Sequence, residues 1–276
     1  MFQCHSIEYY DRIRCRRRRV VTASGCLNET RRERQKLTQK NDFRFSVPLY
    51  TVGEAARIVD VPSSTLASWA RGYVRHFRDR PDVIERPVIT CFPQRTRQEP
   101  SLPFVGLAEA LVLAAARRSG VPMQRVRPAL DELQRQMGIA HALASRRLYT
   151  DGAELLYDYD EACRSAGSGR EPTDLVVLRS NQRVFVDVLD KYLRRIEYGA
   201  DGYASVIHVP AYDRAEVVAD PTRSFGAPIF ERGAARVADV LDRFWAGEAL
   251  SDLAEEYGVP ADQLKDVVRV TSRQAA

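Results

Sequence analysis

Cysteine is scarce in this chain of 276 residues, and its five copies follow no paired spacing. Without a C-x-x-C pair the sequence shows neither a structural zinc finger nor a disulfide framework, so reduced thiols are the better interpretation. The first three cysteines are evenly spaced and His5 lies beside the first, but a metal site there would require a polar, arginine-rich segment to fold. The five cysteines are Cys4, Cys15, Cys26, Cys91 and Cys163.

Long apolar runs are also missing. No run approaches the roughly 18 residues that a membrane-spanning helix needs, and the arginine-rich start lacks the apolar core of a signal peptide. The overall composition, with 45% hydrophobic and 29% charged residues, is ordinary for a globular protein with a sizeable core. The sequence therefore predicts a cytoplasmic protein without a membrane partner.

Catalytic and metal-binding motifs are absent from the sequence. The four histidines, at positions 5, 76, 141 and 208, have no metal-ligand spacing, and there is no glycine-rich phosphate loop, nucleophile elbow or H-E-x-x-H motif. The acidic cluster Asp158, Asp160 and Glu161 is better read as a solvated edge than as a metal site. We therefore expect no enzymatic activity, no metal and no cofactor.

Basic charge is concentrated in the first half of the chain. Residues 1–47 carry 12 basic and 5 acidic side chains, residues 48–135 carry 13 and 9, and the remainder carry 17 and 23. This asymmetry favours a polyanion as the partner of the first half, and water or a basic protein as the partner of the acidic end. The alternative is that a basic tail alone sets the high pI. That tail is either an arm that tracks DNA or an over-extended reading frame.

A spacing typical of the helix-turn-helix motif follows the tail. Ala56 precedes a turn at Asp60 and a Val-Pro pair, and an apolar stripe at Leu66 and Trp69 follows. Two helices that cross steeply need a small residue at their contact, a turn residue that tolerates positive φ, and apolar residues three to four apart. The spacing therefore points first to nucleic acid, and it places Trp69 in the core rather than on a base-stacking surface.

The caps and outward residues of this motif define a candidate recognition helix. Thr51, with Glu54 three residues later, predicts a capping box on the first helix. Ser63 is expected to cap the second helix, which ends at Gly72. The outward side chains of the second helix are short hydroxyls and one long base, suited to base edges and to a phosphate. The predicted contacts on this helix are Ser63, Ser64, Thr65, Ser68 and Arg71.

A β-hairpin wing is expected after the recognition helix. Residues 87–92 alternate like a strand, residues 93–97 form a polar turn, and residues 102–105 resume the strand. Cations beside a recognition helix contact phosphates without reading sequence. The predicted phosphate contacts are Arg75 and Arg78 from the loop after the recognition helix, and Arg95 and Arg97 from the wing. The alternative is a solvated polar face on a purely structural domain.

The helix-turn-helix spacing returns at residues 254–267, and more loosely at 116–129. We predict three helices at the end of the chain: Val237 to Trp245, a second ending at Tyr257-Gly258, and a third from Ala261 to about Val270. Acidic side chains, Asp266 among them, dominate the second and third helices and would repel phosphate, so protein contact is the better interpretation. The predicted partner-binding residues are Arg232, Arg236, Arg243, Asp252, Glu255 and Glu256.

These patterns predict a mainly α fold with small β elements. In the middle of the chain, helices are expected at residues 107–119, 123–137 and 184–196, and strands at 174–178 and 203–209. The expected divisions are a disordered basic tail (1–47), a winged helix-turn-helix domain (48–106), a helical region with a linker (107–172), a small α+β insert (173–212) and a C-terminal trihelical interaction module (213–276).

The segment "LYTVGEAARIVDVPSSTLASWARGY", with the hairpin and "SLPFVGLAEALVLAAARRSGVP" that follow, resembles the winged helix-turn-helix domain of MerR-like regulators. The end of the chain is similar to the domain-of-unknown-function 433 family, on the match of Gly226, Pro228, Ile229, Gly247 and Glu248. The combination resembles VapB-type antitoxins of type II toxin-antitoxin modules. That resemblance implies a PIN-domain ribonuclease toxin as partner, repression of the shared promoter, and a homodimer or a hetero-oligomer with the toxin.

The resemblance to antitoxins also implies how the acidic end would act. Its carboxylates would meet the basic RNA-binding surface of the toxin, and Arg232, Arg236 or Arg243 would reach the metal site of that nuclease. Two other readings stay open: a stand-alone MerR-like regulator with a small-molecule pocket within residues 102–212, and an adaptor that binds no DNA.

Overall fold

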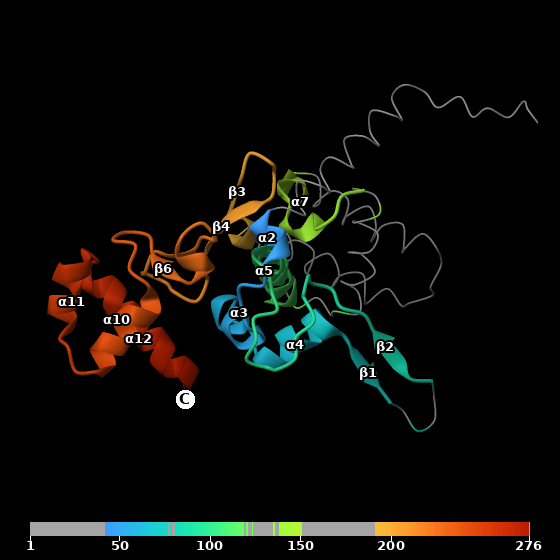
Figure 1. The fold of residues 1–276 in the computed structure, drawn as a ribbon, viewed down its shortest axis with the longest axis horizontal. Coiled ribbons are helices and arrows are strands. Elements are labelled where there is room, and N and C mark those ends of the chain that lie inside the picture. The colour runs from blue at the N-terminus through green and yellow to red at the C-terminus, as the bar shows by residue number, and fades with distance from the viewer. Residues whose placement is uncertain are drawn as a thin grey trace, which may run out of the picture. The chain divides into compact units, whose positions relative to one another are not determined.

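The computed structural model describes residues 42–76, 78, 81–118, 120, 123, 135, 138–150 and 191–275. All the elements in these ranges belong to one compact unit, Asp42–Ala276 (Figure 1). The predicted basic tail up to residue 41, the helix at 123–137 except for two of its residues, the linker and the strand at 174–178 lie outside the described residues. Within them, no helix is long and apolar enough to cross a membrane.

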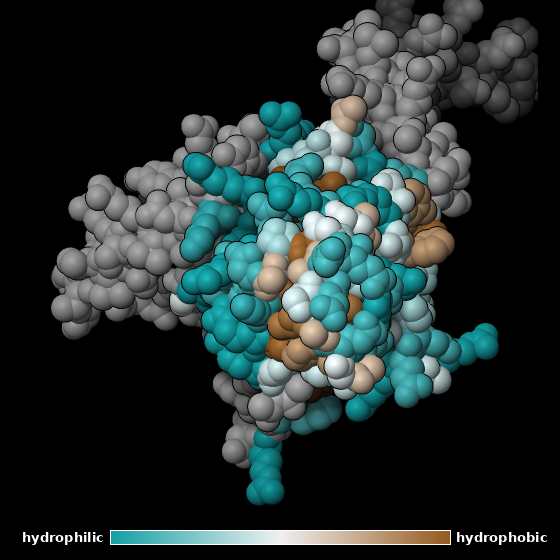
Figure 2. All heavy atoms as spheres, turned by 90° about the vertical axis from the view of Figure 1, so that its left-hand side faces the viewer, coloured by the Kyte–Doolittle hydropathy of each residue, from teal (hydrophilic) through white to brown (hydrophobic). Residues whose placement is uncertain are grey.

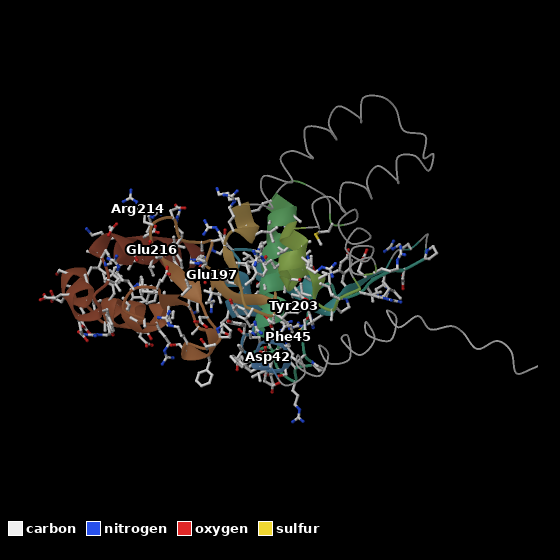
Figure 3. All side chains as sticks on the ribbon, turned by 90° about the horizontal axis from the view of Figure 1, so that it is seen from above. Asp42, Phe45, Glu197, Tyr203, Arg214 and Glu216 are labelled. Atoms are coloured by element: carbon white, nitrogen blue, oxygen red, sulfur yellow. The ribbon has the colours of Figure 1, made fainter. Side chains whose placement is uncertain are left out.

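The folded chain begins earlier than residue 48. Helix α2 (Phe43–Ser46) starts at Asp42, whose carboxylate accepts a hydrogen bond from the backbone N–H of Arg44. The Phe45 ring is buried and meets the edge of Tyr203 at 5.2 Å between ring centroids (Figure 3). The expected boundary of the tail at residue 47 is therefore wrong, because residues 42–47 contribute to the core.

Helices α3 (Val52–Ile58) and α4 (Ser63–Arg71) form the predicted helix pair. The capping box is confirmed, since the Thr51 side chain accepts from the Glu54 backbone while the Glu54 carboxylate accepts from the Thr51 backbone. Ala56 is buried, as a small residue before the turn was expected to be. Ser63 is not the cap that the sequence predicted: it is the first helical residue, and Pro62 occupies the cap position without a side-chain hydrogen bond.

Two substitutions on α3 are expected to act in opposite directions. Thr51→Ala should lower the free energy of unfolding by about 1 kcal/mol, because the first turn loses its cap. Gly53→Ala should raise it by about 0.5–1 kcal/mol, since an added Cβ meets only the Thr51 hydroxyl oxygen, at 4.0 Å, and restricts the unfolded chain. Urea denaturation of the two variants measures both changes. An unchanged stability of Thr51→Ala would contradict the capping assignment.

Helix α5 (Phe104–Arg118) is the centre of the core. Every residue from Phe104 to Ala116 is buried, which agrees with the apolar pattern expected for 107–119. The helix packs against α2, strand β4 (Ala204–His208) and the 3-10 turn η1 (Ala142–Ala144), which precedes α7 (Arg146–Thr150). Its one buried carboxylate, Glu109, accepts the backbone N–H of Thr90 and contacts the His141 ring. The loop that contains Thr90 and the turn η1, which follows His141, are therefore both held by α5.

A four-stranded antiparallel sheet joins the middle of the chain to its end. Its order is β3 (Ile196–Tyr198), β4 (Ala204–His208), β5 (Val217–Ala219) and β6 (Ile229–Phe230). The strand expected at 203–209 is present as β4. The pairing of β4 with β5 crosses residue 212, however, so the expected division between an insert and a C-terminal module does not separate two folding units.

A tight turn connects this sheet to the helix-turn-helix. The turn η2 (Ser224–Gly226) precedes β6, and the Tyr50 hydroxyl, just before α3, donates to the Gly226 carbonyl at 2.9 Å. Gly226 has φ +79°, and an added Cβ would lie 2.2 Å from the Tyr50 oxygen, so only glycine fits. Burial, chiefly, raises the pKa of the Tyr50 phenol, which stays protonated and able to donate.

The chain ends in three helices, α10 (Val237–Trp245), α11 (Leu250–Tyr257) and α12 (Ala261–Ala275), which we call the three-helix module (Figure 1). The first two follow the predicted bounds, and the third runs further than Val270. Gly258 ends α11 in the left-handed conformation, with φ +63°. The three helices begin at residue 237, and β5 and β6 precede them in the predicted module 213–276.

Asp266 on α12 fastens the module to the sheet. Its carboxylate is 1% exposed and accepts the backbone N–H groups of Asp213, Arg214 and Ala215 just before β5. Arg269 adds an ion pair at 2.5 Å. Burial by itself would raise the pKa of Asp266, but the backbone donors and Arg269 lower it. The expectation that Asp266 belongs to an acidic outer face is therefore wrong.

Candidate nucleic-acid interface

The turn of the helix-turn-helix has the geometry that its sequence predicted. Asp60 adopts a positive φ of 55°, and the backbone N–H of Val61 bonds to the Ala56 carbonyl at 3.0 Å. Arg118, in the last turn of α5, donates to both the carbonyl and the carboxylate of Asp60 and to the Tyr192 hydroxyl. The turn is therefore held in place by the core helix.

The recognition helix α4 has a buried stripe and an exposed face. Leu66, Trp69 and Ala70 are buried, which confirms the core assignment of Trp69. Ser63, Ser64 and Arg71 are exposed, as the sequence predicted, while Thr65 and Ser68 are half-buried. Because Pro62 makes no side-chain cap hydrogen bond, the first-turn N–H groups of α4 have no capping side chain as acceptor. Such a face offers donors for phosphate and hydroxyls for base edges.

Two of the predicted contacts already have partners within the protein. The Ser68 hydroxyl donates to the Thr65 carbonyl at 2.8 Å, in its own helix. The Thr65 hydroxyl accepts from the Arg117 guanidinium at 2.6 Å. Thr65 and Ser68 are therefore less open to a ligand than Ser63, Ser64 and Arg71, and Arg117 lies at the same surface.

The hairpin that follows α4 is nearer to it than the sequence indicated. Strand β1 (Tyr73–Arg75) begins directly after Gly72 and pairs antiparallel with β2 (Val83–Glu85), with Val74 opposite Ile84. Gly72 has φ +71°, and an added Cβ would lie 2.1 Å from the Glu85 carbonyl oxygen, so glycine is required where helix becomes strand.

The wing predicted at residues 87–105 is wrong. Within that range no strand forms, apart from an isolated bridge between Tyr50 and Leu102, and Phe104 already begins α5. The physical reason is proline, which cannot donate to a ladder of hydrogen bonds. The segment contains four prolines, Pro87, Pro93, Pro100 and Pro103.

The predicted phosphate contacts consequently come from two different places. Arg75 ends β1 and Arg78 is exposed in the hairpin connection, so both belong to the hairpin rather than to a loop before it. Arg95 and Arg97 are exposed on the proline-rich loop, where the Glu99 carboxylate accepts the Arg95 backbone N–H at 2.7 Å. The structure does not bring these four arginines into one wing.

Sequence reasoning missed the two arginines at the end of α5. Arg117 reaches the recognition helix and Arg118 reaches the turn, so both contribute to this surface. Basic residues in the last turn of a helix are common because they complement the helix dipole. The local sequence therefore gave no signal that these two side chains meet residues that lie more than fifty positions earlier.

Of the predicted partner-binding residues, Arg232 and Arg236 precede α10, and the others lie in the three-helix module. Arg232, Asp252 and Glu255 are exposed. Arg236 is exposed and pairs with Asp239 at 3.3 Å.

Arg243 is occupied within the module. It donates to Glu248, Glu256 and the Tyr257 hydroxyl, which raises its pKa and lowers that of each carboxyl group. This engagement leaves Arg243 poorly placed to enter the metal site of another protein. In the described part of the chain, no group of three or more His, Cys, Asp or Glu residues is arranged to hold a metal ion. Cys91 is a free, half-buried thiol, and the other cysteines lie outside the described residues.

Comparison with known proteins agrees with this geometry. A family model described as "Putative DNA-binding HTH domain" matches residues 48–130. A Mycobacterium tuberculosis protein named "Putative antitoxin VapB45" is 48% identical over 83% of this chain and 96% of its own length. A second protein of that organism, uncharacterized Rv2308, is 27% identical over 82% of this chain and 90% of its own. The crystal structure of Rv2018, also from M. tuberculosis, matches 81% of this chain and 98% of its own, with a TM-score of 0.65 and 40% identity. This chain therefore carries a helix-turn-helix domain and belongs to the family of VapB45.

Proposed function

We propose that this protein is a DNA-binding antitoxin of a type II toxin-antitoxin module. In this proposal the helix-turn-helix binds the promoter that the protein shares with its toxin, and the three-helix module binds the toxin. The observation that carries it is the 48% identity to VapB45 over 83% of this chain. The exposed hydroxyl and arginine side chains of α4 support the DNA-binding half.

The finer features of the proposal rest on the resemblances in the sequence. The domain that contains α3, α4 and the β1–β2 hairpin is proposed to be of the MerR-like winged type, with the hairpin at 73–85 as its wing. The end of the chain is proposed to be a domain-of-unknown-function 433 module. Paired half-sites in the operator would make a dimer on DNA the default arrangement.

The proposed toxin is a PIN-domain ribonuclease that this protein inhibits by direct contact. The three-helix module supports such a partner because its surface is acidic and a ribonuclease needs a basic surface to bind RNA. Asp252 and Glu255, which are exposed, would face that surface, while Arg232 and Arg236 are the cations in reach of an acidic metal site.

One experiment tests both halves. The full-length protein is co-expressed with the product of the neighbouring gene, and growth, complex formation and binding to a labelled promoter duplex are measured. An antitoxin should restore growth, form a stable complex and bind the duplex with an affinity that falls as salt rises. If the protein formed no complex with the product of the neighbouring gene, and its duplex affinity changed with a small ligand, it would instead be a stand-alone regulator. A protein that binds no duplex would be an adaptor.

Arg117 provides a sharper test of the DNA-binding surface. Arg117→Ala should weaken binding to all duplexes similarly and reduce the slope of log affinity against log salt by about one, because a phosphate contact releases one counterion. The control is Arg214→Ala, which removes an exposed arginine from the loop before β5 (Figure 3). An unchanged slope in Arg117→Ala would exclude this residue from the interface.

A further inference from the structure

The connection between α10 and α11 exposes apolar side chains, although the three-helix module around it is acidic. We call residues 245–250 the Trp245 turn. Trp245 is 55% exposed, and Ala246, Gly247 and Ala249 are exposed beside it. An added Cβ on Gly247 would meet no atom within 4 Å, so the turn is open to solvent there. Figure 2 views the molecule from the side on which this module lies in Figure 1, and hydrophilic side chains cover most of that face.

The Trp245 turn is held rigid by Arg243. The guanidinium binds the Glu248 carboxylate at 2.6 Å and the Glu256 carboxylate at 2.6 Å, and it donates to the Tyr257 hydroxyl at 3.0 Å. Glu248 is the one charged residue of the turn, and this pairing directs its carboxylate toward Arg243. The turn is thus tied to both helices before any partner binds, which lowers the entropic cost of binding.

The two helices that flank this apolar turn are acidic. Residues 237–257 contain six acidic residues and one basic residue, Arg243. Asp242, Asp252 and Glu255 are exposed. An exposed tryptophan within charged surroundings is typical of the anchors that dominate binding energy at protein interfaces, while the charges around it set the approach of the partner.

We infer that Trp245 anchors the toxin, with the indole in an apolar pocket and the surrounding carboxylates facing lysine and arginine side chains at the rim of that pocket. This inference rests on the proposed function and adds the residue that carries the contact. The charge of the module selects the partner: a second copy would bring the same carboxylates against one another, and nucleic acid would be repelled.

The test uses the full-length protein and the product of the neighbouring gene. Trp245→Ala should weaken the complex at least about 30-fold, as the loss of a binding anchor does, and Trp245→Phe should weaken it less because an aromatic ring remains. The control is Ile84→Ala, which shortens a side chain that is 73% exposed on the hairpin and should leave the affinity unchanged. Circular dichroism and thermal melting show that each variant is folded.

The charged rim has its own variant. Asp242→Lys should slow association several-fold and weaken its salt dependence, whereas Glu216→Lys, an exposed acid before β5 (Figure 3), should not. If the wild type and Trp245→Ala bound the toxin with equal affinity, the inference would be overturned and the proposed function would stand. A change of oligomeric state in Trp245→Ala with unchanged toxin affinity would assign the turn to contact between copies instead, and would also overturn it. Absence of any wild-type complex would overturn both proposals.

Discussion

Asp266→Asn is expected to lower the free energy of unfolding by about 2–4 kcal/mol, because an amide can accept the three backbone N–H groups only by turning its NH₂ toward Arg269, with which it forms no ion pair. The carboxylate accepts from Asp213, Arg214 and Ala215, and Arg269 pairs with it. The NH₂ group of asparagine is itself a donor, so it cannot accept from either the backbone N–H groups or Arg269. Arg269 also loses its negatively charged partner. Urea denaturation at neutral pH measures the loss.

The same group gives stability a pH dependence of known sign. The pKa of Asp266 is lowered in the folded protein, whereas the unfolded chain titrates near about 3.9. Its stabilising effect is therefore complete above the unfolded pKa and is lost as pH falls below it toward the folded pKa. The gap in stability between the wild type and Asp266→Asn should narrow over that range.

The control for Asp266 is an exposed acid on the same helix. Asp262→Asn should change stability by no more than about 0.5 kcal/mol, mainly through the helix dipole. If Asp266→Asn cost no more than this control at neutral pH, the carboxylate would not fasten the module to the sheet.

Trp69→Ala is expected to cost about 3–5 kcal/mol of stability, the range for truncating a large aromatic side chain in a core. Trp69 is 2% exposed and lies on the stripe with Leu66, so the cavity would form beneath the recognition helix. Denaturation should show the loss directly, and duplex binding should fall in parallel with the folded fraction.

A second variant separates the core role of Trp69 from a role in stacking on bases. Trp69→Phe fills most of the cavity and should retain most of the stability and the duplex affinity. If Trp69→Ala remained as stable as the wild type but bound the duplex more weakly, the indole would be a contact surface for DNA and the core assignment would fail.

Local signals account for the parts of the fold that sequence predicted well. Thr51 with Glu54, the positive φ at Asp60 and the end of α4 at Gly72 each depend on residues a few positions apart. The bounds of α10 were readable for the same reason, since its apolar stripe and the following glycine are contiguous.

Features that depend on distant residues could not be predicted in this way. In the sequence, Asp266 looks like a surface acid of α12. Only the fold shows that the loop at 213–215 packs against it and buries its carboxylate. Arg117 could be assigned to the interface only when α5 was placed beside α4.

The misplaced wing has a different cause. Residues 87–92 alternate as a strand would, whereas the actual strands, β1 and β2, are three residues each and too short to show a period. Proline on either side of the alternating segment was the signal against a ladder there.

The hydrogen bond from Tyr50 to Gly226 couples the stability of the helix-turn-helix to that of the sheet that holds the three-helix module. Tyr50 immediately precedes the capped helix of the DNA-binding motif, and Gly226 leads into the strand beside which the terminal helices are fastened. Unfolding of either end removes support from the other, so the described unit should melt in one cooperative transition. A ligand that binds only the folded three-helix module stabilises the whole unit by mass action. It therefore also lowers the unfolded fraction of the recognition helix.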